Sequence, residues 1–201
     1  MSAFPATIII SLLAASAFTK PIPLSYLSPD GALKAIVIPT GRDAGATKIE
    51  SREGIPLEYE CRVEIYTRKG RKIWSEDFGS PDHDHGRGVA FAAWSPDSSY
   101  FVFSTVSSGG HHPWQYFTYA YSRKQNDLHI LDRFIGEVIR EEFTFAPPDI
   151  ISLTVFDRSV MDSTEDWPSK TVTVSLSKLL AYKKPAPENL RVNPSIYSPF
   201  Q

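Results

Sequence analysis

The chain has 201 residues, of which 42% are hydrophobic, 12% aromatic and 22% charged. This composition is typical of one folded soluble domain and excludes a disordered or fibrous chain. The formal net charge of −2 and the pI near 6.2 provide no excess of positive charge for phosphates, so we expect no nucleic-acid binding.

The first segment is typical of a secretory signal peptide (residues 1–17). An apolar run from Ala6 to Ala17 contains no charged side chain and is too short to cross a bilayer as a helix. Ala15-Ser16-Ala17 supplies the small residues that a signal peptidase requires. The alternative is a buried N-terminal strand or helix. We therefore expect a secreted or periplasmic protein without a transmembrane span in its mature form.

Strand patterns predominate from there on, and turn residues separate them at short intervals. The predicted strands fall into three groups: 33–39, 59–66 and 71–78; 88–95, 99–107, 115–122 and 127–134; 140–147, 150–157 and 170–177. One short helix is predicted near 177–184. The sequence thus predicts an all-β domain over residues 18–182, followed by a proline-rich tail over 183–201.

Cys61 is the only cysteine, so no disulfide can form within the chain. In the stretch LEYECRVEIY (57–66), apolar residues alternate with Glu58, Glu60, Arg62 and Glu64. Because side chains alternate across a strand, this pattern places Cys61 on the buried face and the charged residues on the solvent face.

A Ser-Pro-Asp turn between two strands occurs twice, in YLSPDGALKAIVIP (26–39) and AWSPDSSYFVFST (93–105). FTFAPPDIISLTVF (143–156) is a degenerate third copy. Serine accepts a backbone hydrogen bond at the first turn position, and proline sets φ at the second. Another hairpin follows the first two copies, so each of them predicts a four-stranded antiparallel meander.

The Ser28-Pro29-Asp30-Gly31 turn and its echo at Ser95-Pro96-Asp97 resemble the repeat of TolB-like (PD40, WD40-like) β-propellers over roughly residues 24–177. The resemblance implies about three propeller-like blades, and a role as a platform for other proteins in the cell envelope. Because single-chain propellers close with about four to eight blades, three blades predict an open or sandwich-like monomer, or a homodimer that closes the ring.

Four histidines fall in two loops that the meander brings to the same end of the second sheet. His83 and His85 precede its first strand, and His111 and His112 follow its second strand. Two imidazoles separated by one residue, with a third nitrogen from the other loop, would suit zinc or copper. Asp82 or Asp84 could orient the rings. The alternative is two mobile loops with solvated histidines.

Aromatic residues occur in the loops assigned to that end, namely Trp114, Tyr116 and Trp167. Exposed aromatic planes could hold a peptide segment or a small glycan. The alternative is that the tryptophans fold back and cap the core.

These features predict an exported binding or scaffold protein, more readily non-enzymatic than enzymatic, that holds a protein, peptide or glycan partner at its histidine-rich end. No catalytic residues are assigned. One alternative is a zinc- or copper-binding protein, including a metal-dependent hydrolase, that uses His83, His85 and His111 or His112. Another is a structural domain that completes its sheet against a partner by strand addition.

Overall fold

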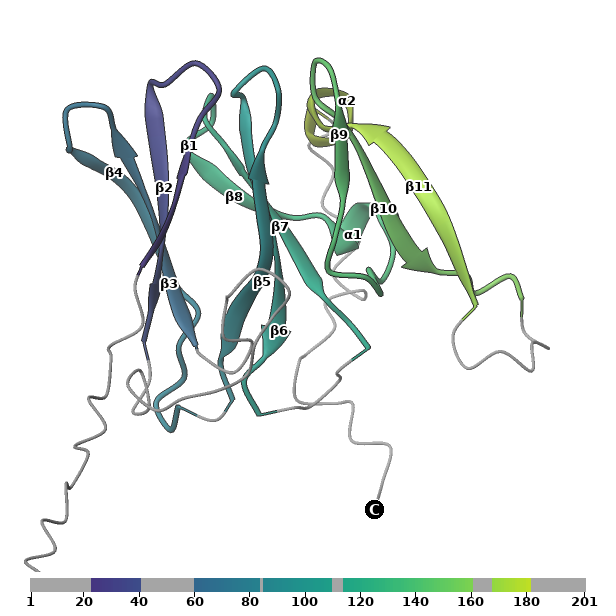
Figure 1. Cartoon of the computed structure of the whole chain (residues 1–201). Helices are drawn as coiled ribbons and strands as arrows, with labels where there is room; N and C mark the ends of the chain where they lie inside the picture. Colours follow the sequence, from purple (N-terminus) through teal and green to yellow (C-terminus); the bar gives the residue numbers. More distant parts are fainter. Residues whose placement is uncertain (1–22, 41–59, 84, 110–113, 161–167, 182–201) are drawn as a thin grey trace, which may run out of the picture.

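The computed structural model describes residues 23–40, 60–83, 85–109, 114–160 and 168–181. These residues form three antiparallel sheets and two short helices (Figure 1). They do not form a closed barrel or propeller. No helix within the described ranges is long and apolar enough to span a membrane.

The first two sheets are four-stranded meanders, as the sequence predicts. The first sheet contains β1 (Leu24–Leu27), β2 (Leu33–Pro39), β3 (Cys61–Thr67) and β4 (Lys72–Asp77), in that order. The second contains β5 (Arg87–Trp94), β6 (Tyr100–Ser107), β7 (Phe117–Ser122) and β8 (Asp127–Ile130), also in chain order.

The third sheet has three strands, β9 (Thr144–Ala146), β10 (Ile150–Phe156) and β11 (Ser169–Ser175), with β10 in the middle. Helix α2 (Leu176–Ala181) follows β11 directly, close to the predicted position. The β9 side of β10 is extended by Val138, which bridges Val155.

One prediction was wrong, because the strand expected over 127–134 ends at Ile130 and is followed by helix α1 (Asp132–Ile135). The Asp132 carboxylate accepts the backbone N–H groups of Thr118 (2.8 Å) and Val138 (3.4 Å), which holds the chain against β7 in a helical turn. Gly136, at φ 99°, ends the turn in a conformation that glycine adopts without strain.

Two core clusters explain the order of the three layers. Leu33, Ala35 and Val37 of β2 and Cys61, Val63 and Ile65 of β3 pack with Phe101, Phe103 and Tyr121 of the second sheet. Val102 and Ala120, on the opposite face of the second sheet, pack with Ile151, Leu153 and Val155 of β10. The second sheet therefore lies between the other two and is buried on both faces (Figure 1).

The two Ser-Pro-Asp turns have the same hydrogen bonds. Ser28 Oγ donates to Asp30 Oδ1 (2.6 Å) and accepts the Leu33 N–H (2.9 Å). Ser95 Oγ donates to Asp97 Oδ1 (2.6 Å) and accepts the Tyr100 N–H (2.9 Å). A shared turn chemistry thus sets the start of β2 and of β6.

The turns also bind one another across the layers. The Asp30 N–H donates to Ser98 Oγ (3.0 Å), and the Asp97 N–H donates to the carbonyl oxygen of Pro148 (3.1 Å). Each turn is therefore tied to the corresponding turn of the next sheet, at the end of the sheets opposite to the β2–β3 connection.

We expect Ser95→Ala to lower the free energy of unfolding by about 1–3 kcal/mol, because the Tyr100 N–H loses its buried acceptor. Ser99→Ala, one residue before Tyr100, is the control and should change the free energy of unfolding by less than about 0.5 kcal/mol. Urea unfolding of the two variants measures the difference. Equal effects of the two substitutions would contradict this role of the Ser95 hydroxyl.

Candidate functional site

The loops before β5 and after β6 meet at one end of the second sheet, as the meander predicts. The Ser108 N–H donates to the carbonyl oxygen of Gly86 (3.0 Å), and Ser108 Oγ donates to Glu60 Oε1 (3.1 Å). Glu60 directly precedes β3, so the first sheet meets the same two loops. We call this region the loop end.

Glu60 anchors the loop end. Its side chain is only 1% exposed and accepts hydrogen bonds from the Ser80 N–H (2.7 Å), the Ser80 hydroxyl (2.5 Å) and the Gly86 N–H (2.6 Å). Burial opposes ionisation, but the donated hydrogen bonds outweigh it and lower the pKa of Glu60. A Cβ at Gly86 would lie 2.3 Å from the Glu60 carboxyl carbon, so only glycine fits there.

The sequence did not predict this burial. Strand alternation placed Glu60 and Glu64 on the solvent face, yet their exposed fractions are 1% and 3%. Cys61, by contrast, is buried as predicted.

Two of the four predicted histidine ligands lie in the described residues. His85 Nδ1 is 2.5 Å from Asp82 Oδ2, and His83 Nδ1 is 3.6 Å from Glu60 Oε2. His111 and His112 lie outside the described residues, as does Asp84. Within the described ranges, no group of three or more His, Cys, Asp or Glu side chains is placed to hold a metal ion.

The three predicted aromatic residues do not share one environment. Tyr116 is half-buried against the second core cluster, its N–H donates to the carbonyl oxygen of Val138 (2.9 Å), and burial raises its pKa. Trp114 is also half-buried, and Trp167 lies outside the described residues. Tyr116 thus contributes to the core as well as to the loop end.

The sequence also gave no sign of a charged cluster behind the loops. The Arg87 guanidinium lies over the Phe117 ring, 3.9 Å from its centre, and its Nη1 has no hydrogen-bond partner among the described residues. Burial raises the pKa of the nearby Asp132 to about 7, although the N–H groups of Thr118 and Val138 oppose this. The Asp132 carboxyl group and the Arg87 guanidinium therefore both lie near the start of β7, behind the loop end.

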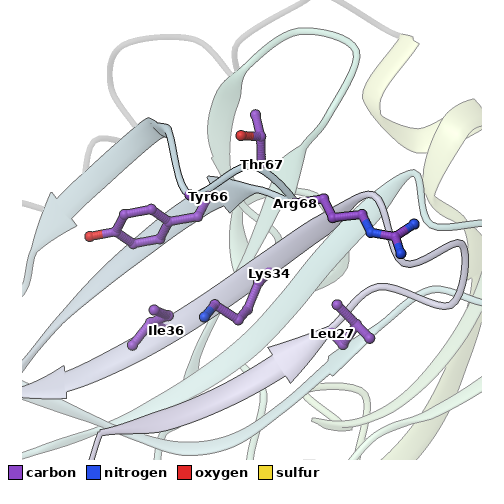
Figure 2. A pocket seen from close by; sticks show the side chains of 7 residues that line it. Leu27, Lys34, Ile36, Tyr66, Thr67 and Arg68 are labelled. Carbon is purple, nitrogen blue, oxygen red and sulfur yellow. The ribbon is translucent and has the colours of Figure 1, made fainter.

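A groove lies on the outer face of the first sheet, at the end opposite to Glu60. Its volume is about 450 Å³, and it is lined by Leu27, Lys34, Ile36, Tyr66, Thr67, Arg68 and Gly70. Figure 2 shows Lys34 between Ile36 and Leu27, with Tyr66 and Arg68 on the adjoining strand and turn. Leu27 is 66% exposed at the edge of this groove.

The groove carries positive charge, because the negative charge of the neighbouring Glu64 is already balanced by Arg62 and Lys72. Glu64 Oε1 lies 3.0 Å from Arg62 Nε and from Lys72 Nζ, and the Tyr66 hydroxyl donates to Oε2. Although burial opposes it, these contacts lower the pKa of Glu64. The side chains of Lys34 and Arg68 have no ion pair among the described residues, so their charges remain available.

A retrospective signal for this groove is present in β2. In LKAIVIP (33–39), Leu33, Ala35 and Val37 face the core, which places Ile36 and Ile38 on the outer face beside Lys34. Ile36 and Ile38 are both partly exposed on this face.

Comparison of the sequence with protein-family models gives no match, and comparison with curated proteins gives none either.

We expect Glu60→Gln to lower the free energy of unfolding at pH 7 by about 1–3 kcal/mol, because an ionised acceptor of several buried donors is lost. The folded-state pKa is lowered, so this stabilisation is present above the unfolded pKa of about 4.3 and is lost as pH falls through the folded value. The difference between wild type and variant should therefore narrow below about pH 4.

The exposed Glu76 provides the control, and Glu76→Gln should change stability by less than about 0.5 kcal/mol. Urea unfolding at several pH values measures both variants. A difference between wild type and Glu60→Gln that stays constant from pH 7 to pH 3 would contradict the role of the Glu60 charge.

Proposed function

We propose that this chain is an exported, non-enzymatic binding protein with a propeller-like β domain. Two four-stranded meanders with equivalent Ser-Pro-Asp turns and three sheets stacked face to face support this interpretation. They also fit the resemblance to TolB-like propellers, whose blades serve as platforms for other proteins. The fold alone does not identify a partner, so the partner is inferred from the surface that would bind it.

The observation that carries the proposal is the groove on the outer face of the first sheet. Lys34 and Arg68, which have no ion pair within the described ranges, lie together there with the apolar side chains of Leu27 and Ile36, beside the Tyr66 ring. This combination favours a partner segment that carries both carboxylates and an apolar side chain. The groove lies at the end of the sheet opposite to the loop end, where the sequence placed the partner.

An acidic polypeptide fits the groove better than a nucleic acid or a glycan. A nucleic acid would require a track of phosphate contacts and several stacking rings, whereas the lining of the groove contains two cationic side chains and one tyrosine. A glycan would favour exposed aromatic planes and needs no cation. The isoleucine and leucine of the groove suit the side chain of a peptide.

Selection of displayed random peptides on the purified protein tests this proposal. We expect enrichment of peptides with Asp or Glu next to an aliphatic or aromatic residue, with affinity that falls as salt rises. Lys34→Glu with Arg68→Glu should weaken binding of the selected peptides about tenfold or more, because attraction becomes repulsion.

The matched control is Lys124→Glu with Arg133→Glu, which changes the net charge equally at exposed positions outside the groove. It should leave peptide binding within about twofold of wild type. Selection of peptides without acidic residues, or equal losses in both double variants, would contradict the assignment.

A metal-binding function is the second candidate, favoured by the contact between His85 and Asp82. Histidine ligands of metal ions commonly donate their second ring nitrogen to a carboxylate, which orients the ring. His85 Nδ1 and Asp82 Oδ2 are 2.5 Å apart, and His83 lies two residues away beside Glu60. His83 and His85, with His111 or His112, would hold zinc or copper at the loop end.

Thermal unfolding with and without zinc or copper tests this candidate. At 100 times its dissociation constant, a bound ion stabilises by about 2.7 kcal/mol, which raises Tm by several degrees. His83→Ala with His85→Ala should abolish the rise, whereas His129→Ala on β8 should preserve it. A Tm that does not respond to either metal would exclude this function.

A further inference from the structure

Among the described strands, none pairs with the outer edge of β11. In the first two sheets a fourth strand, β4 or β8, pairs with the third strand of the meander. In the third sheet α2 follows β11 at once, and no described strand occupies the corresponding position (Figure 1). Leu176 and Leu180 of α2 pack into the second core cluster, so this helix covers the core face and not the edge.

The other edges of the sheets are protected against further pairing. β4 carries the exposed charges of Lys72, Glu76 and Asp77, and its pairing with β3 is irregular at Tyr66. β8 has four residues and β9 has three, while the Tyr26 carbonyl oxygen of β1 accepts the Trp94 indole N–H. Short length, charge and irregular register are the devices that prevent edge-to-edge association.

β11 lacks these devices. It has seven residues, SKTVTVS, that pair with β10 in an unbroken register from Ser169 to Ser175. Lys170 is its only charged residue, and Lys170 Nζ already lies 3.1 Å from Asp157 Oδ1. An edge of this length rich in threonine and valine favours the addition of another strand.

The hydrogen bonds at the two ends of the β10–β11 ladder show which groups point outward. The Leu176 N–H donates to the Asp149 carbonyl oxygen, and the Asp157 N–H donates to the Pro168 carbonyl oxygen. Because antiparallel hydrogen bonding alternates, Lys170, Val172 and Val174 bond to β10. The N–H and C=O groups of Thr171 and Thr173 therefore face the open edge.

We propose that β11 pairs with β11 of a second copy of this chain, in an antiparallel arrangement about a two-fold axis at Val172. The two three-stranded sheets then form one six-stranded sheet. Thr171 of each copy lies opposite Thr173 of the other, and the outward N–H and C=O groups of these two residues pair. Ser175 lies at the end of this ladder, because its carbonyl oxygen begins helix α2.

The edge is self-complementary in charge and shape. Lys170 falls opposite Val174 in this register, so no like charges meet, and Lys170 keeps its contact with Asp157. Val172 meets its own copy and extends the core face of each sheet. The chain after α2 carries prolines at 185, 187, 194 and 199, which lack the N–H needed for a ladder. A second copy is therefore favoured over the tail of the same chain.

Sedimentation equilibrium of the purified protein, with two double variants, tests the pairing. We expect wild type to approach the mass of two chains as concentration rises. Thr171→Lys with Thr173→Lys places lysine opposite lysine twice and should weaken dimerisation about tenfold or more. Thr171→Lys with Thr173→Glu differs at one residue only, places lysine opposite glutamate twice, and should remain dimeric.

A mixing experiment distinguishes the effect of the pairing register from the effect of net charge on dimerisation. The double-lysine variant mixed with Thr171→Glu/Thr173→Glu should give a heterodimer, although each alone is monomeric. Thermal unfolding checks that all variants fold. Wild type that stays at the mass of one chain up to about 100 μM, or double variants that behave alike, would overturn the proposal. The proposed dimer does not depend on the groove, so a failure of peptide binding there would not contradict it.

Discussion

Burial of the second sheet on both faces is the constraint on which the arrangement of the molecule depends. β6 contributes Phe101 and Phe103 to one core cluster and Val102 to the other, and all three side chains are fully buried. A strand that packs on both faces needs apolar residues without alternation, and the consecutive residues YFVF (100–103) provide them. The first and third sheets are therefore fixed as outer layers, each with one face left for solvent or a partner.

The polar contacts between layers complement this apolar packing at both ends of the sheets. At one end, the Asp30 and Asp97 N–H groups reach the next turn along. At the other end, the Glu60 carboxylate gathers donors from Ser80, Gly86 and Ser108. Each such hydrogen bond adds little to the free energy of unfolding, because the same groups bond to water in the unfolded chain. Burial of one of these groups without a partner would lower the free energy of unfolding much more. These hydrogen bonds therefore fix the relative position of sheets that hydrophobic packing alone would allow to slide.

Local sequence patterns predicted the strands and the meanders, because alternation and turn chemistry act over a few residues. They failed where the outcome depends on distant contacts. Glu60 follows a polar alternation, and its burial comes from Ser80 and Ser108, which are 20 and 48 residues away. The pattern around 127–134 favoured a strand, and the Asp132 carboxylate turned it into a helix by binding Thr118 and Val138. The groove combines side chains of three strands, so a single stretch of sequence indicates only a part of it, such as Ile36 on the outer face of β2.

A backbone hydrogen bond joins Thr40, after β2, to Glu60, before β3. The Thr40 N–H donates to the Glu60 carbonyl oxygen (2.6 Å), so the two ends of the connection between β2 and β3 are joined at its base. Glu60 also accepts hydrogen bonds from the Ser80 and Gly86 N–H groups, so the end of β2 is linked through this one residue to the loop before β5. The backbone and the side chain of one glutamate thus hold the edges of two sheets in place at the same time.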